Sequence, residues 1–108
     1  MSKAYYRSQI EGYKRDIERE KAKIADCREE IAKVKIRKSR ETENYARQLK
    51  NANSSAQKHN IRASKARQWE SFVREIDREK DKIESCKKNI ERYRDSIARS
   101  RESMKRAS

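Results

Sequence analysis

Proline is absent from this sequence of 108 residues, and Gly12 is its single glycine. Most turns between strands need Gly, Pro, Asn or Asp at particular backbone dihedral angles. A β-rich or α/β fold of this length would need many such residues. Their scarcity excludes those fold classes and favours a single domain made almost wholly of helices.

Residues that support catalysis or metal binding are also scarce. His59 is the one histidine, and the two cysteines do not form a Cys-x-x-Cys pair. No glycine-rich loop that could cradle a phosphate is present. Enzyme chemistry needs polar groups that converge in a pocket, and no residues in this sequence form such a constellation. We therefore expect no enzyme activity, no catalytic or metal-binding residue, no cofactor and no small-molecule substrate.

Long apolar runs are missing as well. None approaches the roughly 18 residues of a membrane span, and residues 1–6 lack the apolar stretch of a signal peptide. We expect a cytoplasmic protein without a membrane span. Export together with a partner, by a route that needs no signal peptide, remains an alternative.

What the sequence has in excess is charge with helical periodicity. Charged residues make up 45% of the chain, and the formal net charge is +13. High charge can indicate disorder, but the apolar residues recur at regular intervals, which disorder does not require. Good helix formers combined with heptad spacing are typical of long helices or a coiled coil.

Two stripes of apolar residues follow the a and d positions of a heptad, one in each half of the chain. Isoleucine dominates position a in both stripes. We expect the seam of a hairpin to consist of Ile10, Ile17, Ile24, Cys27, Ile31 and Val34 in the first half and Ile76, Ile83, Cys86, Ile90 and Ile97 in the second.

The two halves also repeat each other. Residues 15–27 and 74–86 are identical at eight of 13 positions. Glu20 and Glu79 both occupy position d, where a buried unpaired carboxylate would cost stability. We interpret them as residues that specify register, with pairing to a basic residue of a partner as the alternative.

The register of the stripes predicts an antiparallel hairpin. Pairing position a with position d across the interface places the bend at residue 55, inside the polar stretch 51–60. We therefore expect helices over about residues 3–50 and 61–105, with that stretch as the connection. A single long helix that dimerises is the alternative, because the stretch contains no Gly or Pro.

Cys27 and Cys86 both lie on the predicted seam, in neighbouring layers. One interpretation is that they are two small buried hydrophobic residues. The other is a disulfide across the helices, but the diagonal offset is marginal for its geometry. A cytosolic origin also disfavours that bond.

Most of the excess charge surrounds the predicted bend. Residues 35–68 carry ten Lys or Arg and two Asp or Glu, a balance of +8. This stretch is either a solvated tip or a basic patch for an anionic partner. Nucleic acid would be the default anion, but no recognised nucleic-acid motif is present. The residues of this basic tip are Lys35, Arg37, Lys38, Arg40, Lys58, Arg62, Lys65 and Arg67.

Aromatic residues provide the candidate interface. A lone hairpin buries little surface, so it would gain stability by joining another helical protein or a second copy in a four-helix arrangement. Aromatic residues are enriched at binding hot spots. The predicted partner interface comprises Tyr6, Tyr13, Trp69, Phe72 and Tyr93.

The paired tyrosines at positions 5 and 6, the ladder Ile10, Ile17, Ile24, Cys27 and Ile31, and the region around Trp69 carry a resemblance. The chain resembles the small helical proteins that accompany LXG toxins of the bacterial type VII secretion system. The sequence departs from related secreted hairpins, because no glycine follows Trp69 and no Tyr-x-x-x-Asp/Glu motif follows the second helix. The resemblance implies a chaperone or targeting factor that binds the helical N-terminal region of a toxin.

Overall fold

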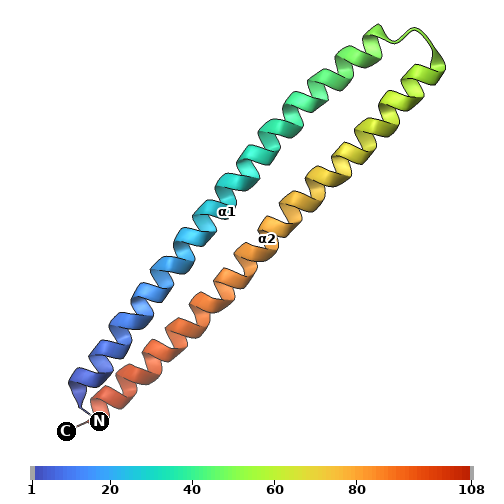
Figure 1. The fold of residues 1–108 in the computed structure, drawn as a ribbon. Coiled ribbons are helices and arrows are strands. Elements are labelled where there is room, and N and C mark those ends of the chain that lie inside the picture. The colour runs from blue at the N-terminus through green and yellow to red at the C-terminus, as the bar shows by residue number, and fades with distance from the viewer. Residues whose placement is uncertain (1, 108) are drawn as a thin grey trace. The chain divides into compact units, whose positions relative to one another are not determined.

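The computed structural model describes residues 2–107, and its helices in that range are α1, Lys3–Asn51, and α2, Ser55–Arg106. Figure 1 shows the two helices joined by a short connection. The predicted all-α class, an antiparallel two-helix hairpin, is confirmed. Neither helix of the described chain contains a stretch long and apolar enough to cross a membrane.

The connection between the helices is shorter than predicted. It comprises residues 52–54, whereas we expected the whole polar stretch 51–60 to lie outside both helices. Ser54 Oγ accepts a hydrogen bond from the backbone N–H of Gln57 at 3.1 Å, and Gln57 Oε1 accepts one from the backbone N–H of Asn53 at 2.7 Å. A serine followed three residues later by glutamine is a capping pattern that starts a helix. The polar residues after Ser54 therefore begin α2.

The hairpin divides into two units, each with one stretch of α1 and one of α2. The connection unit is Arg28–Lys80, and the terminal unit contains the described residues of Met1–Cys27 and Asp81–Ser108. The helices run antiparallel in each unit, because the partners of later residues on α1 are earlier residues on α2.

Polar contacts between the helices mark this antiparallel pairing. In the connection unit, Arg37 Nη2 lies 2.9 Å from Glu75 Oε2, and the Tyr45 hydroxyl donates a hydrogen bond to Gln68 Oε1 at 3.5 Å. In the terminal unit, the Ser100 hydroxyl donates to Gln9 Oε1 at 3.3 Å.

The outward faces of the helices carry ion pairs between residues one helical turn apart. Lys33 Nζ, for example, lies 3.5 Å from Glu30 Oε1 and 3.9 Å from Glu29 Oε1. Each such exposed pair stabilises a helix by only a few tenths of a kcal/mol. The main contribution to the stability of the hairpin therefore comes from apolar area buried between the helices, at about 25 cal/mol per Å².

The core of each unit is narrow. Val34 and Phe72, in the connection unit, are the most buried apolar residues at 3% exposure each. No side chain of the described residues falls below 2% exposure. Two helices cover a seam residue from too few directions to bury it completely.

Candidate functional site

Most residues of the predicted seam are buried, which supports the heptad register. Ile31 and Ile76 are the exceptions, since each is only half-buried. The buried seam residues are Ile10, Ile17, Ile24, Cys27, Val34, Ile83, Cys86, Ile90 and Ile97.

Tyr45 belongs to the core of the connection unit, at 8% exposure, and our sequence reasoning missed it. A signal was present, because Tyr45 lies five heptads after Ile10 and so continues position a. The polar residues around Tyr45 concealed that continuation. Its buried ring extends the seam toward the connection.

A polar layer interrupts the apolar seam of the terminal unit at Glu20, which is 6% exposed. Lys23 Nζ donates a hydrogen bond to Glu20 Oε1 at 3.4 Å, while Oε2 has no hydrogen bond of ordinary geometry. The Cys86 thiol lies against this carboxylate and is the largest cause of the lowered pKa of Glu20. Burial opposes this effect by raising the pKa, while Asn89 and Lys23 lower it further. Glu79, the counterpart of Glu20 in the repeat, is half-buried.

The two cysteines are both buried, and no disulfide joins them. Burial raises the pKa of the Cys86 thiol, and the neighbouring Glu20 carboxylate raises it further. Both effects favour the protonated thiol. Cys86 is therefore a small buried residue of the seam whose thiol lies in a polar layer.

Tyrosines gather in the terminal unit. The rings of Tyr13 and Tyr93, one from each helix, have centroids 6.2 Å apart and are tilted by 31°. Tyr5 and Tyr6 are in edge-to-face contact, with centroids 5.4 Å apart. Of the predicted interface residues here, Tyr6, Tyr13 and Tyr93 are half-buried.

Trp69 lies in the connection unit, half-buried, with two lysines near its ring. Lys38 Nζ, from α1, is 4.3 Å from the ring centroid, and Lys65 Nζ, from α2, is 5.7 Å away. Both are within the range of cation–π attraction. Phe72, by contrast, is a core residue at 3% exposure, so little of its side chain is accessible to a partner in this hairpin.

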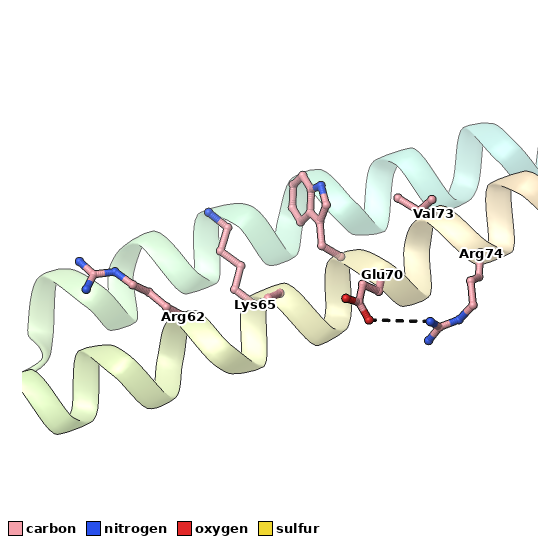
Figure 2. A pocket seen from close by; sticks show the side chains of 7 residues that line it. Arg62, Lys65, Glu70, Val73 and Arg74 are labelled. Atoms are coloured by element: carbon pink, nitrogen blue, oxygen red, sulfur yellow. Dashed lines mark ion pairs between the residues drawn. The ribbon is translucent and has the colours of Figure 1, made fainter.

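An open hollow of about 690 Å³ lies along α2 beside Trp69 (Figure 2). We call it the Trp69 hollow. It is lined by Arg62, Lys65, Ala66, Trp69, Glu70, Val73 and Arg74.

The residues of the basic tip all lie in the connection unit. Lys38 and Lys65 are half-buried, and the other six are exposed. Arg37 forms an ion pair with Glu75, but the other seven have no acidic partner in the described chain. Their charge is therefore available to a molecule that binds there.

Residues 2–107 contain no group of three or more His, Cys, Asp or Glu side chains placed to hold a metal ion. His59, expected in the connection, is an exposed residue of α2. Searches with protein-family models, curated proteins and solved structures find no match for this chain.

Proposed function

We propose that this chain is a non-enzymatic helical-hairpin adaptor that binds another helical protein. The observation that carries this proposal is the incomplete coverage of its apolar residues. Val73 is 45% exposed and Ile36 is 53% exposed, and Trp69 is only half-buried between its neighbours. Helices of a partner packed against the hairpin would cover such residues and complete a bundle.

The resemblance to LXG toxin partners suggests a particular version of this function. The partner would be the helical N-terminal region of a toxin, and the hairpin would act as its chaperone or targeting factor in the cytoplasm. Both proteins would then leave the cell together through type VII secretion.

Nucleic-acid binding is a second candidate, favoured by the charge of the basic tip. Residues 35–68 carry a balance of +8, and seven of the eight tip residues lack an acidic partner. Phosphate contacts of this kind weaken steeply as salt rises. An apolar helical interface does not, so salt dependence separates the two candidates.

A self-assembling structural coiled coil is the third candidate, because a second copy would also cover the apolar residues. The net charge of +13 opposes it, since two copies would repel each other. Sedimentation of the purified chain over a range of concentrations would reveal such assembly.

A tagged pull-down from the native cell, with and without nuclease, tests the proposed function. We expect a defined helical protein to stay bound after nuclease treatment and in high salt. Identification of a toxin would support the specific version. Recovery of nucleic acid alone, together with loss of every protein after digestion, would overturn the adaptor proposal.

A further inference from the structure

The Trp69 hollow has the length of a short helix contact. Its lining residues recur every three or four positions from Arg62 to Arg74, so they occupy one face of α2. Twelve steps at 1.5 Å per residue span about 18 Å, or roughly three helical turns. A partner helix can lie along such a face with its side chains between those of α2.

The floor of the hollow is apolar and incompletely covered. Trp69 supplies an indole ring, and Ala66 and Val73 lie one helical turn before and after it. Val73 remains 45% exposed. Tryptophan in such a setting is the residue type most enriched among binding hot spots.

Cations without acidic partners border this apolar floor. Arg62 and Lys65 from α2, with Lys38 from α1 over the ring, form no ion pair in the described chain. Glu70 is the one acidic residue of the lining, and its Oε2 already lies 3.9 Å from Arg74 Nη1. Figure 2 shows this pair and, separately, the side chains of Arg62 and Lys65.

From this arrangement we propose that the Trp69 hollow is a docking site for an acidic amphipathic helix of a partner protein. Apolar side chains of that helix contact Trp69 and Val73, and its carboxylates pair with Lys38, Lys65 and Arg62. This inference rests on the proposed adaptor function and specifies where the partner binds and which charge it carries.

Charge complementarity selects this occupant over the others. A second copy of the chain brings its own charge of +13 and a tip of the same sign, which disfavours close approach. The phosphates of a nucleic acid would pair with the cationic side chains but would leave Val73 without an apolar contact. An acidic helix satisfies both the cations and the apolar floor, as in other helix-in-groove complexes.

The chain provides its own probe, because Trp69 is its single tryptophan. The test titrates the full hairpin with a synthetic peptide of about 18 residues, roughly five helical turns, that carries leucines on one face and glutamates beside them. A twin peptide has lysine in place of every glutamate, and a single-stranded oligonucleotide forms the third arm. We expect the acidic peptide alone to shift the Trp69 emission in a saturable way.

Charge reversal at the hollow supplies the matched variants. Lys65→Glu should lower the affinity of the hairpin for the acidic peptide by at least about tenfold, which is about 1.4 kcal/mol of binding free energy. Lys87→Glu makes the same change of net charge on an exposed residue of the terminal unit and should alter affinity by less than about twofold. Val73→Glu, which removes an exposed apolar contact, should weaken binding without touching the core. Far-UV circular dichroism checks that each variant remains helical.

Equal affinities for Lys65→Glu and Lys87→Glu would overturn the inference. So would an emission shift produced by the oligonucleotide or the basic peptide and not by the acidic one. A helical protein that still binds Lys65→Glu and Val73→Glu in the pull-down would refute this docking site and leave the adaptor function standing. Absence of any helical protein partner would instead refute the function itself.

Discussion

The thiol of Cys86 on α2 lies against the carboxylate of Glu20 on α1, inside the seam of the terminal unit. This contact lowers the pKa of Glu20, while burial and then the carboxylate raise the pKa of Cys86. A charged acid and a protonated thiol are therefore the stable combination. Each group gives the hairpin a distinct pH dependence.

Glu20 should make folding sensitive to acid. Its pKa in the folded state is below the ordinary value of 4.5, so ionisation favours folding above that pH. This contribution is lost as the pH falls through the lowered value. We expect Glu20→Gln to lose less stability than the wild type below about pH 4.5, measured by thermal unfolding. Glu84→Gln, at an exposed position, is the control and should follow the wild type.

Cys86 should make folding sensitive to alkali. Its pKa in the folded state is above the ordinary value of 9.0. The protonated thiol therefore makes its full contribution to the stability of the fold below pH 9.0. The contribution is lost as the pH rises from 9.0 toward the raised value, because the unfolded chain releases the proton first. Thermal unfolding under reducing conditions should show that the stability of Cys86→Ala declines less steeply at alkaline pH than that of the wild type. An unchanged decline would show that the thiol is not responsible.

Phe72 should be among the residues that contribute most to stability. It is 3% exposed, and Phe72→Ala leaves a cavity that should lower the free energy of unfolding by about 3 kcal/mol. Its neighbour Val73 is 45% exposed, so Val73→Ala should cost less than about 1 kcal/mol. Urea unfolding followed by circular dichroism measures both. Similar losses for the two variants would contradict the assignment of Phe72 to the core.

Ser54 should stabilise the start of α2. Ser54→Ala removes the side-chain oxygen that accepts a hydrogen bond from the Gln57 N–H at 3.1 Å. Loss of such a cap typically costs about 1 kcal/mol. Thermal unfolding should show this cost for Ser54→Ala and almost none for Ser55→Ala, which changes the first helical residue. Equal effects would indicate that the cap is unimportant.

The sequence predicted the seam well because heptad spacing is a property of residue order alone. Buried isoleucines such as Ile17 and Ile90 follow directly from it. The same spacing overestimated the burial of Ile31 and Ile76. Register tells which face of a helix a residue occupies, but not how closely the two helices approach at that position. Tyr45 was overlooked although it satisfies the register.

Two features could not be predicted from the sequence: the length of the connection and the position of the lysines around Trp69. The connection was predicted too long because serine and asparagine favour both loops and helix starts, and only the Ser54 contacts distinguish the two. The lysines around Trp69 depend on side-chain conformations that residue order does not specify. Composition located the basic tip, but not the apolar floor that its cations border.

Joining two long helices by residues 52–54 also determines how the chain can fold. Contacting partners are 23 residues apart for Tyr45 and Gln68, but 91 apart for Gln9 and Ser100. Closing a longer loop costs more entropy, so we expect the helices to pair first near the Ser54 turn and then progressively toward both chain ends. The basic tip should then acquire its native form before the Glu20–Cys86 layer does.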